Sequence, residues 1–302
     1  MVEEVNVCRS LSTFADLLGP PSATPPKKLP WETICDEVVC ITTQNASQNR
    51  WKFLKRALEH ADLARMVTLL VNARPCDLQG RSCELIDACF ASHFCIIQKA
   101  QEEKLRLVLI LEDDVYFDVE GLPRAIEACR SFLEADLPFS AFLFGGVYTE
   151  MSSTEVDGVH KGRGMQAHAW LVNVRHPVWN VALDSGYRMQ DLYNHAHGET
   201  YMVYPDVAFQ KDFSAGEKKR PTYNLAEFPP LYRALTSIGL RFGMRNCWEG
   251  CARSTNAIVR TTGSIKAALV ILGVLVGVLS CAIVIMACTW AAKCKKSSSP
   301  DT

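Results

Sequence analysis

The sequence lacks an excess of charge of either sign. Its 302 residues include 32 Lys and Arg residues against 33 Asp and Glu residues, which gives a formal net charge of −1. Nucleic-acid-binding domains usually carry a basic patch or a high isoelectric point, so we expect no nucleic-acid partner. No internal repeat with a period of about 20–50 residues is present, which argues against solenoids and propellers.

The 13 cysteines include no Cys-x-x-Cys pair, the spacing typical of redox and zinc sites. Their odd number and scattered positions favour free thiols in a reducing compartment. Residues 1–8 include acids and no apolar core, so they lack the pattern of a secretory signal. We therefore expect the large domain to lie in the cytosol.

A long uncharged segment is present near the carboxyl end. Residues 267–292 contain no charged side chain, and about 20 apolar residues suffice to cross a bilayer. The sequence therefore predicts one C-terminal transmembrane helix at 267–292, after a juxtamembrane linker at 247–266 and before a short polar tail at 293–302. This predicts a single-pass membrane protein anchored through its C-terminal helix.

The rest of the chain is long enough for one α/β domain with a small appendage. Residues 11–18 have a helical pattern and prolines follow them, so we expect 1–33 to form an N-terminal helix and a proline-rich linker. Residues 34–246 form the expected catalytic domain. Within it, the polar, glycine-bearing residues 149–164 are predicted to be a mobile loop over the site.

The most informative stretch lies between Arg106 and Val115. Five apolar residues, 107–111, lead directly into Glu112, Asp113 and Asp114. A short, uniformly apolar run is typical of a strand buried on both faces of a mainly parallel α/β sheet, and such sheets bind ligands at the carboxyl ends of their strands. Hard cations bind carboxylates together with substrate phosphates. On their own, the three acids fit a metal site and an acidic turn equally well.

The neighbouring motifs favour the metal site. A predicted strand at 38–42 is followed by Arg50, and the run from Ala88 to His93 (Ala-Cys-Phe-Ala-Ser-His) opens a helical segment before the acidic strand. Further pieces follow the acids in a recognisable order: 141–145, 168–173, Asp191, Tyr204-Pro205 and Gln210.

This order resembles glycosyltransferase family 25, the lipopolysaccharide and procollagen galactosyltransferase-like group, over roughly residues 38–214. Two departures are visible. Ala88 stands where the family usually has glycine, and the loop at 42–48 does not have the family's usual short form.

The resemblance implies a GT-A-like α/β domain with a mainly parallel central sheet. It also implies inverting transfer of galactose or a similar sugar from a nucleotide-sugar donor, such as a UDP-sugar, to a hydroxyl on a glycan, lipid or protein. The implied cofactor is Mn²⁺ or Mg²⁺. Such a transfer needs a general base and stabilisation of the departing diphosphate.

We expect Asp114, which lies farthest past the strand, and Glu112 to bind the metal. Asp191 is the candidate base, although an Asp before Leu192 could equally cap a helix. The remaining residues predicted to lie around the donor are Arg50, Ser92, His93, Glu112 and Asp113. The alternatives are an exposed Arg50, a capping Ser92 and a half-buried His93.

A second class of function stays open. The altered first loop and Ala88 also fit a catalytically silent, membrane-tethered adaptor that binds a partner through the same cleft. The three acids favour the enzyme, because an inactive site has no use for three neighbouring carboxylates that repel one another.

Overall fold

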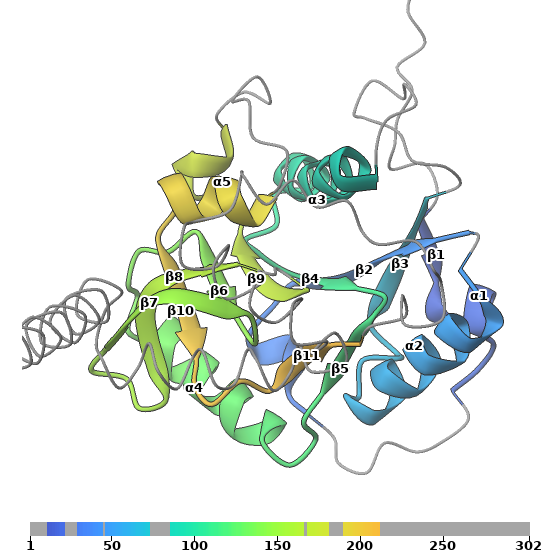
Figure 1. The fold of residues 1–302 in the computed structure, drawn as a ribbon, viewed down its shortest axis with the longest axis horizontal. Coiled ribbons are helices and arrows are strands. Elements are labelled where there is room, and N and C mark those ends of the chain that lie inside the picture. Colours follow the sequence, from blue (N-terminus) through green and yellow to red (C-terminus); the bar gives the residue numbers. More distant parts are fainter. Residues whose placement is uncertain are drawn as a thin grey trace, which may run out of the picture.

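The computed structural model describes residues 11–21, 29–44, 46–72, 85–165, 168–180 and 190–211. They form a mixed α/β fold around a nine-stranded sheet, with a small two-stranded sheet beside it (Figure 1). No helix in these ranges is long and apolar enough to cross a membrane. The predicted linker, transmembrane helix and polar tail at 247–302 lie outside the described residues.

Five α-helices and eleven strands are described. The helices are α1 (Phe14–Leu18), α2 (Gln48–His60), α3 (Leu85–Glu102), α4 (Leu122–Glu134) and α5 (Gln190–His197), with 3₁₀ turns at Trp31–Thr33 and Pro177–Asn180. The strands are β1 (Leu11–Thr13), β2 (Glu37–Thr43), β3 (Val67–Asn72), β4 (Leu107–Glu112), β5 (Val115–Phe117), β6 (Ala141–Leu143), β7 (Val147–Ser153), β8 (Val159–Met165), β9 (Ala169–Asn173), β10 (Thr200–Val203) and β11 (Ala208–Gln210).

The large sheet has the order β1-β3-β2-β4-β9-β6-β10-β8-β7. Three of its eight pairings are parallel, namely β3–β2, β2–β4 and β6–β10, and the other five are antiparallel. The prediction of a mainly parallel sheet is therefore wrong. The physical reason is β9, which runs antiparallel between β4 and β6 but is buried on both faces, so its apolar sequence does not reveal its direction.

Helices cover both faces of the sheet. Leu54 of α2 and Phe132 of α4 pack in one hydrophobic cluster, whereas Phe94 of α3 packs in the other, with α5 beside it. Strand β4 contributes alternately to the two clusters, with Leu109 on one side and Ile110 on the other. Figure 1 shows α3 and α5 on one side of the sheet and α2 and α4 on the opposite side. The predicted strand at 107–111 is thus buried on both faces, as expected.

Residues 11–18 are not one helix. Leu11 pairs with Leu70 in β3, and the helix begins only at Phe14. Thr13 is the reason, because its hydroxyl accepts a hydrogen bond from the backbone N–H of Asp16 at 3.3 Å and its backbone is extended. A residue in that capping conformation cannot continue a helix on its amino side.

The predicted mobile loop at 149–164 is instead the antiparallel hairpin of β7 and β8. Met151 and Val159 are buried, whereas Glu150 and Lys161 are exposed. The polar residues therefore mark the outer face of a half-buried hairpin, and not a segment without a core contact.

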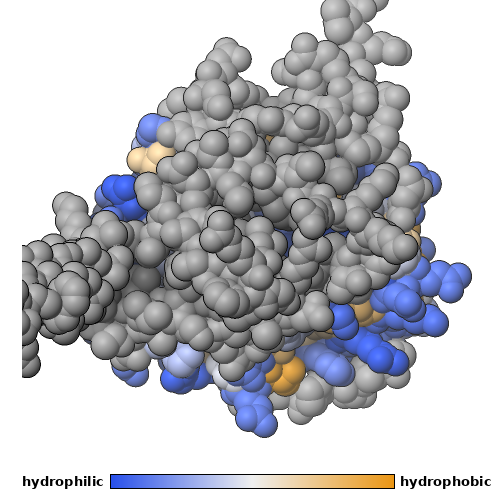
Figure 2. Space-filling model, in the orientation of Figure 1, coloured by the Kyte–Doolittle hydropathy of each residue, from blue (hydrophilic) through white to orange (hydrophobic). Residues whose placement is uncertain are grey.

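The described surface is polar. On the face drawn in Figure 2, the coloured residues are mostly hydrophilic, with few apolar ones among them. Within the described ranges, Leu17 and Leu137 are the large apolar residues that are exposed. The carboxyl edge of the parallel strands is therefore the better candidate for a functional site than an apolar surface patch.

Candidate active site

The parallel strands β3, β2 and β4 end at one edge of the sheet. The chain passes from β2 to β3 on one side and later returns to β4 on the other side of β2. The strand order therefore reverses between β2 and β4, and open α/β sheets bind ligands in the crevice at such a point. Thr42 near the end of β2, Asn72 at the end of β3 and Glu112 at the end of β4 come together there.

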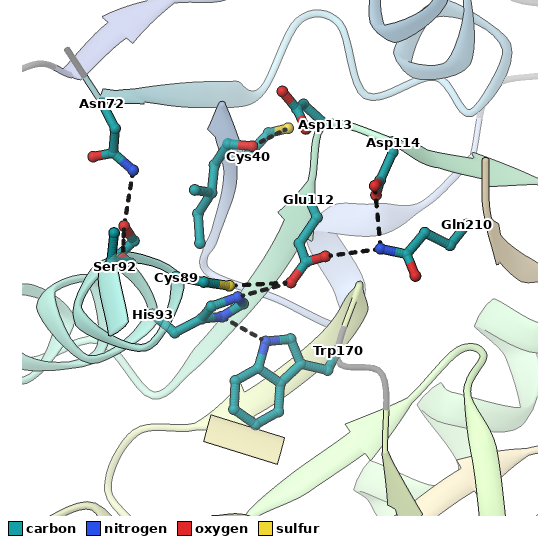
Figure 3. A network of polar contacts seen from close by, with 12 residues as sticks. Cys40, Asn72, Cys89, Ser92, His93, Glu112, Asp113, Asp114, Trp170 and Gln210 are labelled. Carbon is teal, nitrogen blue, oxygen red and sulfur yellow. Dashed lines mark hydrogen bonds and ion pairs between the residues drawn. The ribbon is translucent and has the colours of Figure 1, made fainter. Parts of the chain in front are cut away.

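Glu112 accepts hydrogen bonds from three side chains (Figure 3). Its Oε1 lies 3.3 Å from His93 Nε2 and 3.6 Å from Cys89 Sγ. Its Oε2 lies 3.3 Å from Gln210 Nε2. Burial alone would raise the pKa of Glu112, but the hydrogen bond from His93 lowers this pKa below its ordinary value. Both carboxylate oxygens are thus already used inside the protein.

Cys89, His93 and Glu112 offer three metal-ligand atoms within 4.8 Å of one another. Trp170 argues against an ion among them. Its indole Nε1, which can only donate, lies 3.2 Å from His93 Nδ1, so Nδ1 accepts. A neutral imidazole then carries its proton on Nε2 and donates it to Glu112. The nitrogen that faces Glu112 therefore has no lone pair for a metal.

Asp113 is 4% exposed and both of its oxygens have partners. Thr42 Oγ1 donates to Oδ2 at 2.8 Å, and the guanidinium of Arg50 forms an ion pair with Oδ1. Arg50 lies in the first turn of α2, where Ser47 accepts a hydrogen bond from its backbone N–H at 3.3 Å. Burial raises the pKa of Asp113, although Arg50 opposes the shift. Asp113 and Thr42 thus hold Arg50 at the site.

Asp114 differs from both neighbours. Its Oδ2 lies 3.1 Å from Gln210 Nε2 and 3.5 Å from Arg50 Nη2. Its Oδ1 is buried and has no hydrogen-bond partner in the described part of the chain. Burial, together with the negative charge of Glu112, raises the pKa of Asp114 well above its ordinary value. Buried polar atoms are nearly always paired, so this oxygen is a candidate ligand atom for a cation.

Strand β11 carries Gln210 to the acids. In the pairing of β11 with β5, Gln210 lies opposite Val115, the residue that directly follows Asp114. The next residue, Lys211, donates its backbone N–H to the carbonyl of Asp114 at 2.8 Å. The backbone on both sides of the Gln210–Asp114 contact is therefore fixed.

Glycine at position 145 permits the close approach of β11. A Cβ on Gly145 would lie 1.8 Å from the carbonyl oxygen of Ala208. His168 Nε2 lies 3.2 Å from the same oxygen and donates to it. Any side chain at position 145 would thus displace the strand that presents Gln210.

Ser92 and His93 lie inside α3 and not at its start. The helix begins at Leu85, so Ser92 is not the capping residue that was one alternative. Its hydroxyl donates to the carbonyl of Ala88 at 2.7 Å and accepts from Asn72 Nδ2 at 2.8 Å. His93 is fully buried and not half-buried. Ser92 therefore contacts the end of β3 through Asn72, and His93 contacts the end of β4 through Glu112.

Asp191 is the second residue of α5, and its side chain lies outside the described part of the structure. Two residues later, Tyr193 packs edge-on against Phe94 of α3, with ring centroids 5.9 Å apart. Its role as a base stays a prediction.

Several residues of the network have no site role in the sequence-based prediction, among them Thr42, Asn72, Cys89, Trp170 and Gln210. Trp170 and Gln210 belong to the ordered motifs after the acids, and that order is the one signal that could have singled them out. Cys89 is predicted from the sequence to pack as a small hydrophobe. In the structure it is partly exposed and contacts Glu112.

Open α/β sheets bind ligands, dinucleotides among them, in the crevice at such a switch point. Residues 86–144 match Glycosyltransferase family 25 (LPS biosynthesis protein). The matched segment includes α3 except its first residue, β4 and all three acids. This match confirms the resemblance drawn from these motifs, over that segment of the chain, and it supports the prediction of a glycosyltransferase. No curated protein sequence matches the chain.

Two similar solved structures have low scores. One is a glycosyltransferase involved in the glycosylation of the major capsid of PBCV-1, with 12% identity, a TM-score of 0.32, and coverage of 53% of this chain and 75% of that chain. The other is a mannose-1-phosphate geranyltransferase from Thermus thermophilus, with 10% identity, a TM-score of 0.33, and coverage of 57% and 75%.

Proposed function

We propose that the protein is a metal-dependent, GT-A-like glycosyltransferase that moves a sugar from a nucleotide-sugar donor to a hydroxyl acceptor with inversion. The observation that carries the proposal is the buried Oδ1 of Asp114, which has no hydrogen-bond partner among the described residues and lies beside Arg50 at the carboxyl edge of β4. The family resemblance favours galactose or a similar sugar on a uridine diphosphate.

The residues at this edge fit a divalent cation. Mg²⁺ and Mn²⁺ are commonly bound by one or two carboxylates together with substrate phosphates, so one open carboxylate oxygen suffices. Asp114 would hold the ion through Oδ1. Glu112, the other ligand predicted from the sequence, has donors on both oxygens, and we therefore assign ligation to Asp114. A bound cation would neutralise the charge that develops on the departing diphosphate.

Arg50 supplies a positively charged side chain beside Asp113 and Asp114. A guanidinium presents a rigid fork of donors that suits phosphate oxygens. Asp113 accepts from one nitrogen of this fork, and Asp114 lies 3.5 Å from the same nitrogen. The acids thus hold Arg50 beside Asp114, where it would contact the donor's phosphates.

The main test is a thermal-shift titration of the full chain. Mn²⁺ with uridine diphosphate should raise the melting temperature more than either ligand alone, since each supplies part of the other's binding site. A screen of nucleotide-sugar hydrolysis then identifies the donor. A melting temperature that no combination of Mn²⁺ and nucleoside diphosphate changes would contradict the proposal.

Asp191 is proposed as the base that accepts the acceptor's proton. General bases contribute about 10²–10⁴ in rate, so Asp191→Asn should lower transfer by that factor while nucleotide binding stays within about twofold. Asp136→Asn makes the same substitution at an exposed position just after α4 and should leave transfer unchanged, which makes it the matched control. A loss below about tenfold would remove Asp191 from this role.

The adaptor remains a second candidate, and one observation favours it. Five of the six oxygens of the acidic trio already have partners inside the protein. The acids therefore have a structural use as well, and their presence alone does not require catalysis. Binding of a nucleoside diphosphate without donor hydrolysis or transfer would favour the adaptor.

We also propose that residues 267–292 anchor the chain, because they are uncharged over a length that spans a bilayer. Alkaline carbonate should leave the full-length protein in the membrane fraction. Truncation after Gly263 should release an active protein into solution. Extraction of the full-length chain by carbonate would contradict the anchor.

A further inference from the structure

Gln210 connects the two outer acids of the trio. Its amide nitrogen carries two hydrogens, and its two acceptors are Glu112 Oε2 at 3.3 Å and Asp114 Oδ2 at 3.1 Å. Both neighbours are carboxylates that can only accept when ionised. The nitrogen of the amide, and not its oxygen, must therefore face the acids.

Glu112 is the fixed end of this bridge. The donors run in one direction, from the indole of Trp170 to His93 Nδ1 and from His93 Nε2 to Glu112 (Figure 3). His93 is fully buried and Trp170 is buried in β9, so neither can turn without disturbing the core. Glu112 in turn fixes the amide of Gln210.

Asp114 is the free end. Its Oδ2 lies 3.1 Å from Gln210 Nε2 and 3.5 Å from Arg50 Nη2, so the contact with Gln210 is the shorter one. Arg50 is also shared with Asp113. Because Gln210 occupies Oδ2, it leaves Oδ1 as the oxygen that stays open. An amide held between two carboxylates also reduces the repulsion between them.

We propose that Gln210 is a positioning residue that sets the side-chain conformation of Asp114 and so determines which oxygen of Asp114 binds the divalent cation. This inference rests on the proposed function, since it assigns a role toward the same cation. In this role Gln210 would act through Asp114 and would not itself bind the ion.

The test is Mn²⁺ binding to the full chain, measured by the loss of the free-ion electron paramagnetic resonance signal, without nucleotide. Gln210→Met keeps the length and removes the donor. Its Mn²⁺ dissociation constant should rise by roughly 10- to 100-fold, the usual cost of removing a group that orients a metal ligand. Without Mn²⁺ its melting temperature should fall moderately, because Glu112 and Asp114 both lose a donor, so the dissociation constant is compared at a temperature at which the variant is folded.

Gln101→Met is the matched control. The amide of Gln101 donates to the carbonyl of Val174 at 2.8 Å and lies in α3 at the opposite end from Cys89. This variant should bind Mn²⁺ like the wild type. A second variant, Gln210→Asn, keeps the amide but is too short to reach both acids, so it should also weaken Mn²⁺ binding. It tests the same contact if the methionine variant does not fold.

Saturating Mn²⁺ gives a readout that a purely structural role would not change. If Gln210 acts through the cation, transfer by Gln210→Met should recover toward the wild-type rate as Mn²⁺ is raised. Wild-type affinity in both Gln210 variants would overturn the inference and leave the proposed function standing. Absence of Mn²⁺ binding by the wild type, with and without uridine diphosphate, would overturn both.

Discussion

Glu112 and Asp114 stand two residues apart in one acidic segment, and their surroundings are opposite. Glu112 faces α3 and accepts from Cys89 and His93 on one oxygen and from Gln210 on the other. Asp114 faces β11 and has one oxygen without a partner in the described part of the chain. The pKa of Glu112 is lowered, whereas that of Asp114 is raised.

The different surroundings of Glu112 and Asp114 indicate that neighbouring acids of one motif have different roles. A carboxylate that is saturated with donors is stable as an anion and organises its neighbours. A buried carboxylate with an open oxygen is costly as an anion and gains most from a cation. The acid that is least satisfied within the fold is therefore the better candidate for ligand binding.

The largest expected effect comes from Asp114→Asn. The variant removes the charge that a hard cation binds, so Mn²⁺ affinity should fall by more than about 100-fold, beyond the range for a residue that only orients a ligand. Electron paramagnetic resonance of free Mn²⁺ measures this loss. Turnover should disappear with it while the circular dichroism spectrum stays that of the wild type. Wild-type turnover or an unfolded variant would reverse the assignment.

The same substitution should stabilise the metal-free protein at neutral pH. The folded pKa of Asp114 lies above its unfolded value near about 4, so the native state binds more protons between the two values. Stability from this group therefore falls as the pH rises from about 4 through the raised pKa. Urea unfolding of both proteins across this range should show that the stability advantage of Asp114→Asn grows with pH.

Glu112→Gln should have a smaller effect on Mn²⁺ and the opposite effect on stability. A glutamine amide has one accepting oxygen, so its nitrogen must face a donor from either His93 or Gln210. Leaving a buried donor unsatisfied costs about 1–3 kcal/mol. Mn²⁺ affinity should fall less than in Asp114→Asn.

The pH dependence distinguishes the two acids further. The pKa of Glu112 is lowered in the fold, so its contribution to stability is present above its ordinary value near about 4 and is lost as the pH falls below that value. The destabilisation caused by Glu112→Gln should therefore shrink in acid. A destabilisation that grows in acid would show that Glu112 is not the saturated anion described above.

Much of the fold near the site could be predicted from the sequence. The apolar run at 107–111 is long and uninterrupted, and it forms β4 with alternate residues in two clusters. Residues 51–60 have apolar side chains at helical spacing in the sequence, and they form most of α2. Strand direction could not be predicted beyond β4, because β9 has the same buried apolar composition as a parallel strand.

The site could be predicted only in part. The three acids follow from their position at the end of a buried strand. Their separate roles depend on Gln210 and Trp170, which are distant in sequence and join the acids through the pairing of β11 with β5 and of β9 with β4. Side-chain hydrogen bonds of this kind leave no periodic pattern, so sequence reasoning has no signal for their direction.

The smallest effect on Mn²⁺ is expected from Trp170→Phe, which tests the Glu112 side of the comparison. Losing the indole N–H frees His93 Nδ1 to carry the proton, and Nε2 then has a lone pair directed at Glu112. Cys89, His93 and Glu112 would become a metal-binding set for Co²⁺ or Zn²⁺, which bind thiolate and imidazole. We expect a thiolate-to-Co²⁺ charge-transfer absorption in the variant and none in the wild type, with Mn²⁺ affinity within about tenfold of the wild type.

The control is the double variant Trp170→Phe, Cys89→Ser, which keeps the smaller ring and removes the thiolate, so the absorption should vanish. The change from Trp to Phe in the core should cost less than about 3 kcal/mol, the lower limit for complete truncation of such a side chain, and the fold should survive. If the wild type itself shows an absorption that Cys89→Ser removes, its His93 must already present a lone pair to the ion. The donor chain from Trp170 to Glu112 would then be wrong, and the side of α3, not Asp114, would hold the metal.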